Sequence, residues 1–283
     1  MEAPLTEFAA RPRELDLLAA KFAAVALLAA SPIMHFYNGD CSARLKRDAS
    51  PVTDADEAAE AVIFEALAHV APGVPIISEE AASRGEIPAP GDEFILVDPL
   101  DGTREFLARN GEFAVNIALV RRGKPVCGAI CAPATGQVWF GGEAAYAVQA
   151  QTGDDLPDAA HWRRIHTRGF ARDTAVALVS RSHLDEQTVL LLEAEGVSHR
   201  RSIGSALKFC LMAQGEADIY PRFGPTMDWD IAAGDAILRA AGGIVLGPDG
   251  EPLVYGAEGR DFRVAGFVAW GRRPGGRAAA AQA

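Results

Sequence analysis

Two aspartates, Asp98 and Asp101, stand three positions apart in the stretch DPLDGTREF, directly after the apolar run FILV. Carboxylates that end a buried strand lie where α/β proteins place ligands, although Asp and Pro are also common turn residues. The sequence SEE (78–80) ends a second apolar stretch in the same way, and Asp230 opens a predicted helix. Taken one at a time, these acids have structural explanations: a turn, a solvated strand end and a helix cap.

Taken together, the acids predict a bound cation, because like charges at element ends with no basic partner nearby in the sequence need a positive ion between them. The donors are oxygens without His or Cys, which favours Mg²⁺ over zinc or copper. Gly102-Thr103 adds a phosphate contact, since glycine lets the backbone approach closely and the following amides begin the short predicted helix TREFLA. A threonine hydroxyl beside the ion can orient a water molecule. These residues predict metal-assisted hydrolysis of a phosphate ester.

The composition agrees with an enzyme that acts on a small anion. The 283 residues contain 27 Lys+Arg and 38 Asp+Glu, a net charge of -11, and 49% are hydrophobic. This acidic balance argues against nucleic-acid polymers and anionic membranes as partners. The apolar stretch LLAAKFAAVALLAASPIM is interrupted by Lys21 and is expected to form an amphipathic helix, with no signal peptide and no membrane span. Four cysteines in apolar contexts without C-x-x-C spacing predict reduced thiols and a cytoplasmic protein.

The elements that position these residues fall into two groups along the chain. Helical periodicity marks roughly residues 7–30 and 54–70, and brief β-rich segments then form an antiparallel meander up to about residue 150. After the polar link QTGDDLPDAA, strands and helices alternate in the manner of an α/β protein. The sequence predicts an α+β lobe over 1–150 with most metal ligands, an α/β lobe over 160–270 with substrate recognition and the last metal ligand, and a flexible tail over 271–283.

DPLDGTREF together with WDIAAGDAIL resembles the paired signatures of the inositol-monophosphatase-like, Mg²⁺-dependent, lithium-sensitive phosphatases. The resemblance covers nearly the whole chain, from LKRDASPVTDADEAAE through ISEE to the last predicted helix. It implies the layered α-β-α-β-α sandwich of inositol monophosphatase and fructose-1,6-bisphosphatase. In the second lobe, SRSH (180–183) and GSALKFCLMAQGEADIYPRFGPTMDWDIAAG (204–234) look like the 3'(2'),5'-bisphosphate nucleotidase branch, which serves sulfur assimilation.

The resemblance implies a ligand set for two metal ions. Glu79, Asp98 and the backbone carbonyl of Leu100 would hold one Mg²⁺, and Asp98, Asp101 and Asp230 would hold a second. Asp98 would then bridge the two ions, which would clamp the attacking and leaving oxygens of an in-line displacement.

Three further residues receive catalytic roles from the same resemblance. Thr103 would orient the attacking water, and Asp56, the last acid of PVTDAD, would accept the hydrogen bond of the threonine hydroxyl. Glu80 would orient a water on a third, weakly held ion.

Arg222 occupies a neighbourhood in which inositol phosphatases usually carry an acid, so its guanidinium implies a second phosphate on the substrate. The alternative for Arg222 is an ion pair, and the alternative for Lys208 is a solvated helix residue. Arg181 and His183 are weaker candidates for nucleotide contact. The full set of expected substrate contacts is Gly102, Thr103, Gly204, Ser205, Lys208, Arg222 and Asp230.

The expected reaction is removal of the 3'-phosphate from adenosine 3',5'-bisphosphate, or from its sulfated form, by metal-activated water. Two alternatives stay open. One is an inositol monophosphatase or broad sugar phosphatase that also accepts fructose 1,6-bisphosphate. The other is a non-catalytic protein that senses a nucleotide. The expected partner is a small phosphorylated nucleotide, and a homodimer is left open.

Overall fold

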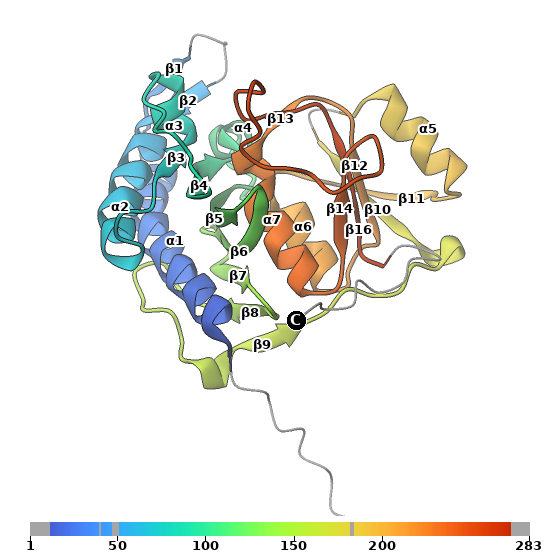
Figure 1. The fold of residues 1–283 in the computed structure, drawn as a ribbon, viewed down its shortest axis with the longest axis horizontal. Coiled ribbons are helices and arrows are strands. Elements are labelled where there is room, and N and C mark those ends of the chain that lie inside the picture. Colours follow the sequence, from blue (N-terminus) through green and yellow to red (C-terminus); the bar gives the residue numbers. More distant parts are fainter. Residues whose placement is uncertain (1–11, 40, 47–50, 182–183, 273–283) are drawn as a thin grey trace, which may run out of the picture.

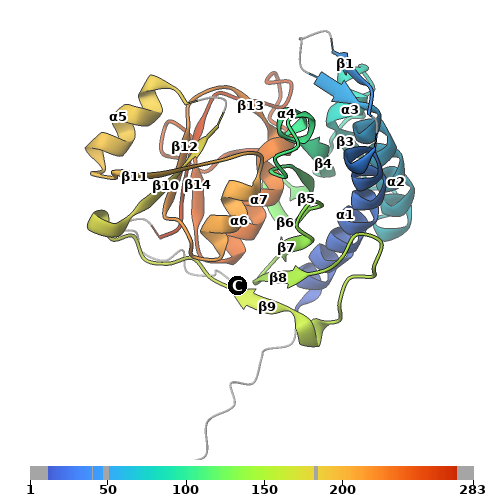
Figure 2. The same ribbon diagram turned by 180° about the vertical axis from the view of Figure 1, so that it is seen from behind.

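The computed structural model describes residues 12–39, 41–46, 51–181 and 184–272. Its elements stack as five layers in the order α-β-α-β-α, which confirms the predicted sandwich (Figures 1 and 2). The outer helices α1 (Glu14–Asn38) and α2 (Asp54–Val70) cover one face of a first sheet. Between the two sheets lie α6 (Leu207–Ala213) and α7 (Asp228–Ala240), and α5 (Glu186–Ala194) covers the far face of the second sheet.

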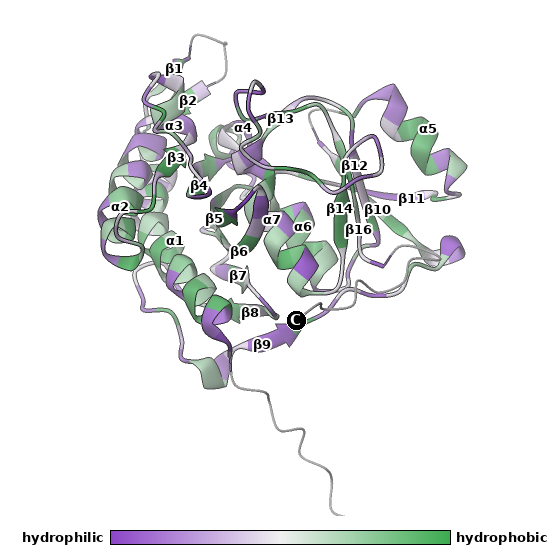
Figure 3. Cartoon of the chain, in the orientation of Figure 1, coloured by the Kyte–Doolittle hydropathy of each residue, from purple (hydrophilic) through white to green (hydrophobic). Residues whose placement is uncertain are grey.

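The first sheet has seven strands in sequence order. Its first two strands run parallel and the remaining pairs are antiparallel, which confirms the predicted meander. The last strand comes from residues 163–165, beyond the polar link, and its two exposed arginines make it hydrophilic in Figure 3. The strands are β3 (Ile76–Ser78), β4 (Glu93–Asp101), β5 (Ala114–Arg121), β6 (Lys124–Ala132), β7 (Gln137–Gly141), β8 (Ala145–Gln149) and β9 (Arg163–Ile165).

Strand β4 is apolar on both faces because helices cover both sides of the sheet. Phe94 and Leu96 join the core around α6 and α7, whereas Ile95 and Val97 join the core beneath α1 and α2. The sequence of a strand that is covered on both faces is a continuous hydrophobic run, without the alternation of polar and apolar residues seen in half-exposed strands. The FILV stretch therefore fixes the strand that delivers Asp98 to the site.

The second sheet has five strands in the order β11-β10-β12-β16-β14. Strand β10 runs parallel to β11 and β12, as the strand–helix alternation predicts, while β16 pairs antiparallel with β12 and β14. Strands β14 and β16 lie after residue 243, where the sequence pattern predicted no strand, so both were missed. The strands are β10 (Val176–Ser180), β11 (His199–Ile203), β12 (Ile219–Arg222), β14 (Ile244–Leu246) and β16 (Phe267–Trp270).

The smaller elements connect these layers and border the site. Two short ladders pair β1 with β2 and β13 with β15. They comprise β1 (Ala43–Leu45), β2 (Pro51–Thr53), β13 (Thr226–Met227) and β15 (Arg263–Val264), and the short helices are α3 (Glu79–Ser83), α4 (Thr103–Leu107), η1 (Ala159–His161) and η2 (Arg172–Thr174).

Helix α1 ends later than the sequence predicts, because it continues through Pro32 to Asn38. The ring of Tyr37 packs against Phe106 and Phe113, with centroids 5.4 and 4.8 Å apart, so tertiary packing offsets the cost of an internal proline. By length and composition α1 could cross a membrane, contrary to the expectation from its apolar run, but 56% of its most apolar window is buried in the fold. The tail from residue 273 lies outside the described residues.

Candidate active site

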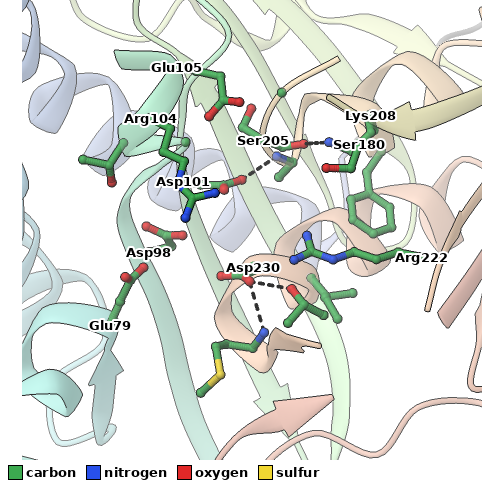
Figure 4. Close-up of a pocket in the computed structure, with 18 of the residues that line it drawn as sticks. Glu79, Asp98, Asp101, Arg104, Glu105, Ser180, Ser205, Lys208, Arg222 and Asp230 are labelled. Atoms are coloured by element: carbon green, nitrogen blue, oxygen red, sulfur yellow. Dashed lines mark hydrogen bonds between the residues drawn. The ribbon is translucent and has the colours of Figure 1, made fainter. Parts of the chain in front are cut away.

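The parallel pair β3 and β4 brings two predicted acids together. Ser78 lies opposite Val97, so both strands end at the same edge of the sheet, with Glu79 opening α3 beside Asp98. Asp230, in the first turn of α7, completes the group. One oxygen from each of these three carboxylates lies within 4.8 Å of the others (Figure 4).

The turn after β4 explains why its carboxylates point to the site. The β4–β5 register shifts between Asp98 and Asp101, and the Leu100 amide donates to Asp98 Oδ1 at 3.0 Å. Gly102 caps α4 with φ 92°, and a Cβ there would lie 3.1 Å from the Glu112 carbonyl oxygen. The chain therefore turns sharply enough to place Asp98, Asp101 and Thr103 around one cavity.

Asp230 has a capping role as well as a place in the acidic group. Its Oδ2 accepts the Thr226 hydroxyl at 2.5 Å and the Met227 amide at 3.1 Å, and the second of these bonds is one half of a capping box at the start of α7. The helix-cap explanation was therefore correct in part, and Oδ1 is the oxygen left for a ligand.

Burial of several like charges raises the pKa of these acids. Burial, followed by the charge of Asp230, raises the pKa of Asp101 to about 7. Burial also raises the pKa of Glu79 to about 7 against the opposing effect of Lys46, and that of Asp98 well above its usual value. Asp98 is 2% exposed. Buried carboxylates in this arrangement gain most from a cation bound among them.

The donor set fits a hard divalent cation, because it consists of carboxylate oxygens and the backbone carbonyl of Leu100. Asp101 lies beside the three converging acids, with its Oδ2 accepting hydrogen bonds from Asn116 Nδ2 at 3.3 Å and from the Ala206 amide. All five predicted metal ligands line one cavity of about 550 Å³.

Lys46 is a partner that sequence reasoning missed. Its ammonium lies 2.6 Å from Glu79 Oε1 and 2.7 Å from Glu80 Oε1, and its side chain is only 8% exposed. Glu79 and Glu80 therefore have a basic partner in space, although none lies near them in the sequence. Lys46 is 33 positions from Glu79, and the available signal was its place in the quoted LKRDASPVT stretch.

The predicted contact between Thr103 and Asp56 is present in the structure. The Thr103 hydroxyl lies 3.4 Å from Asp56 Oδ1 and 3.3 Å from the Leu100 carbonyl oxygen. Asp56 is also held by the hydroxyl and amide of Thr53, at 2.5 and 2.8 Å, and burial raises its pKa to about 6. Thr103 lines the cavity, whereas Asp56 and Glu80 stand behind its wall.

Helix α6 and strand β12 supply cations, Lys208 and Arg222, to the opposite wall of the cavity (Figure 4). Arg222 donates from Nη2 to the Pro225 carbonyl at 3.0 Å, while its buried Nε has no hydrogen-bond partner. Among the described residues Arg222 has no acidic partner within 4 Å, so the ion-pair alternative is not observed. A buried guanidinium nitrogen without a partner can receive an anionic ligand.

Lys208 is neither solvated nor free. It is 3% exposed, and its ammonium donates to the carbonyls of Ile203 and Ser205 at 2.9 and 2.6 Å. It also lies 5.0 Å from the centre of the Tyr220 ring. Lys208 lines the cavity, and its hydrogen bonds hold the loop before α6.

The other predicted substrate contacts, Gly102, Thr103, Gly204, Ser205 and Asp230, also line the cavity. The Gly204 amide, however, already donates to Glu112 at 2.7 Å. Arg181 pairs with the same carboxylate, and His183 lies outside the described residues. Arg104 and Arg263 line the cavity and were missed, although Arg104 directly follows Thr103 in the quoted motif.

We expect metal binding to depend on pH because protons compete for Glu79 and Asp101, whose pKa values are about 7. Below pH 7, the apparent Mg²⁺ affinity should fall with each pH unit by up to about tenfold for every proton that the ion must displace. In the folded protein both pKa values exceed the ordinary values of 4.5 and 3.8, so the folded state binds these protons more tightly than the unfolded chain does. The free energy of unfolding of the metal-free protein should therefore be higher at low pH and should decrease as pH rises through 7.

Thermal unfolding measures both effects. In EDTA, the melting temperature should fall between pH 5 and pH 8, and the stabilisation by Mg²⁺ should grow over the same interval. Glu93→Gln, at the far end of β4, should keep this behaviour. A Mg²⁺ stabilisation of equal size at pH 5 and pH 8 would contradict the assignment.

Comparisons with known proteins agree on one family. The model of the inositol monophosphatase family matches residues 14–273. The 3'(2'),5'-bisphosphate nucleotidase CysQ of Salmonella typhimurium is 44% identical over 229 residues, with 80% of this chain and 89% of that protein covered. CysQ of Escherichia coli K12 is 42% identical over 237 residues with the same coverage. The crystal structure of CysQ from Bacteroides thetaiotaomicron has a TM-score of 0.76 and 36% identity, and the match covers 92% of this chain and 99% of that one.

Proposed function

The chain belongs to the inositol monophosphatase family, and from this premise we propose that it is a metal-dependent 3'(2'),5'-bisphosphate nucleotidase. It removes the 3'-phosphate of adenosine 3',5'-bisphosphate, or of the sulfated form, and releases AMP and phosphate. The observation that carries the proposal is the composition of one cavity. Glu79, Asp98 and Asp230 converge on one wall, and Arg222, with a buried nitrogen that lacks a partner, lies on another.

The acidic wall would hold two Mg²⁺ ions. Glu79, Asp98 and the Leu100 carbonyl would bind one, and Asp98, Asp101 and Asp230 the second. When bound, such ions activate water as a nucleophile and neutralise the charge of a phosphoryl group. A third ion would depend on a water oriented by Glu80, whose carboxylate is held 2.7 Å from Lys46.

Thr103 would orient the attacking water. Its hydroxyl is within reach of Asp56 Oδ1 and the Leu100 carbonyl, and donation to either acceptor leaves its oxygen free to accept a hydrogen bond from water. With a pKa of about 6, Asp56 is mostly ionised at neutral pH and acts as the acceptor. No cysteine or histidine is required as a nucleophile.

Arg222 would bind the second phosphate of the substrate. A guanidinium donates parallel hydrogen bonds to phosphate oxygens, and its charge offsets the acidic wall for a dianionic ligand. The Ser205 amide, which donates to none of the described residues, is a further donor for the ribose or phosphate. We also propose a reducing compartment such as the cytoplasm for this protein, as its cysteines in apolar contexts predict.

Steady-state kinetics on three substrates tests the proposal. With Mg²⁺, kcat/KM for adenosine 3',5'-bisphosphate should exceed that for inositol 1-phosphate by at least about tenfold, because inositol 1-phosphate lacks the second phosphate and a lost charged contact costs about 1.4 kcal/mol or more. It should also exceed kcat/KM for fructose 1,6-bisphosphate, which has a second phosphate but no nucleoside. EDTA should abolish phosphate release from all three. A preference for either sugar phosphate would favour the broad phosphatase, and binding without turnover would favour the sensor.

A further inference from the structure

A carboxylate outside the acidic wall joins the two lobes beside the cavity. Glu112, between α4 and β5, accepts two hydrogen bonds from the Arg181 guanidinium, at 3.1 Å from Nε and 2.7 Å from Nη2. It also accepts the Gly204 amide at 2.7 Å. Arg181 directly follows β10 and Gly204 directly follows β11, so one side chain of the first lobe holds two segments of the second.

The packing at Gly204 leaves no room for a side chain. A Cβ there would lie 2.7 Å from Cγ of Glu105 and 2.8 Å from the Glu112 carbonyl oxygen. Real Cβ atoms do not approach other atoms so closely. The backbone of the loop before α6 therefore rests directly on the segment that contains Glu112.

The other atoms of this loop are also held in place. Lys208 donates to the carbonyls of Ile203 and Ser205, and the Ala206 amide donates to Asp101. Ser205 has φ 49°, a left-handed conformation that non-glycine residues seldom adopt. Strained residues persist where their surroundings fix them, and they gather at ligand sites.

We propose that Glu112 is a positioning residue for the bound nucleotide. Its carboxylate holds the Gly204 amide and thereby fixes the adjacent Ser205 against the cavity. The amide of Ser205 has no acceptor among the described residues and is therefore available to the nucleotide. The inference rests on the proposed function, because a nucleotide extends past its sugar toward this wall, whereas the ring of inositol 1-phosphate is expected to stop short of it. A small ester that occupies the acidic wall alone does not need Glu112.

The two functions of the carboxylate can be separated by substitution. Glu112→Ala removes both the ion pair and the acceptor for Gly204. Glu112→Gln keeps an oxygen for the Gly204 amide. Arg181→Ala removes the ion pair, together with a hydrogen bond from Nη2 to the Ser202 carbonyl at 3.2 Å, and leaves the Glu112 carboxylate in place as the acceptor for Gly204. The matched control is Glu93→Ala, which removes a partner of Arg121 in an exposed ion pair at the far end of β4.

Kinetics and binding of these variants test the inference. Glu112→Ala should raise KM for adenosine 3',5'-bisphosphate by about tenfold, the effect of one hydrogen bond, with kcat changed less than about threefold. KM for inositol 1-phosphate should change less than about twofold. Glu112→Gln and Arg181→Ala should stay close to the unmodified protein, as should Glu93→Ala. Equal increases on both substrates, or equal effects of Arg181→Ala and Glu112→Ala, would overturn it.

Affinity for adenosine 5'-phosphate, measured by calorimetry with Mg²⁺ present, gives a readout independent of turnover. Glu112→Ala should weaken it about tenfold. If the unmodified protein prefers inositol 1-phosphate, the proposed function fails. The role of Glu112 is then decided by the affinity for adenosine 5'-phosphate alone, compared between the unmodified protein and Glu112→Ala. If Glu112→Ala does not fold, Glu112→Asp withdraws the carboxylate by one methylene and should show the same loss. Unchanged affinity in a folded variant refutes the role.

Discussion

Replacing Asp98 with asparagine is expected to lower kcat on every phosphate ester by on the order of a thousandfold, because the residue would bridge both metal ions. Asparagine has nearly the same shape and keeps an oxygen for the Leu100 amide, which donates to Asp98 Oδ1 at 3.0 Å. The local turn should therefore persist while the charge that binds the ions is lost. The measurement is kcat and its Mg²⁺ dependence, with Asp98→Asn requiring much higher Mg²⁺ concentrations.

The same substitution should stabilise the metal-free protein. Asp98 is buried, and the charges of Glu79, Asp101 and Asp230 all disfavour its ionised form. Removing one of these like charges should raise the melting temperature measured in EDTA. Glu93→Gln, the same change at the exposed end of β4, should alter neither activity nor metal binding. Retention of more than a tenth of the activity by Asp98→Asn would exclude a bridging role.

The acidic wall could be predicted because its residues end recognisable elements. Asp98 follows a strand whose apolar run is set by burial on both faces, and Glu79 ends the parallel neighbour of that strand. Parallel strands that end together bring such residues together by geometry alone. Asp230 required the resemblance, because a helix cap explained it equally well from the sequence, and the structure gives it that role too.

The partners of these residues could not be predicted, because they depend on contacts between distant segments. Lys46 reaches Glu79 from 33 positions away, and it lies directly after β1. Nothing in the sequence around Glu112 indicates that it meets Gly204, which is 92 residues later. Helix α1 ran past its predicted end because Tyr37 packs against an aromatic cluster formed by another part of the chain. Local propensity carries no information about such contacts.

The choice between substrates depends on Arg222. Its Nε is buried without a hydrogen-bond partner. Burial lowers the pKa of Arg222, but Tyr220 and then Asp230 and Asp101 raise it above its usual value, and these two acids belong to the proposed metal site across the cavity. Once metal ions neutralise those acids, the guanidinium is the group on this wall best suited to a second phosphate. Inositol 1-phosphate has no second phosphate and should gain little from it.

Arg222→Glu is therefore expected to lower kcat/KM for adenosine 3',5'-bisphosphate by about a hundredfold, since it replaces a charge-assisted contact with repulsion. The loss on inositol 1-phosphate should be less than about fivefold. Arg222→Lys should fall between, because it keeps the charge without the planar fork. Arg201→Glu reverses the charge of an exposed arginine outside the cavity, paired with Glu216, and should leave both substrates unaffected. Equal losses on the two substrates would mean that Arg222 supports the metal site or the fold. The second phosphate would then need another partner, and Arg263, which lines the same cavity, would be the next arginine to replace.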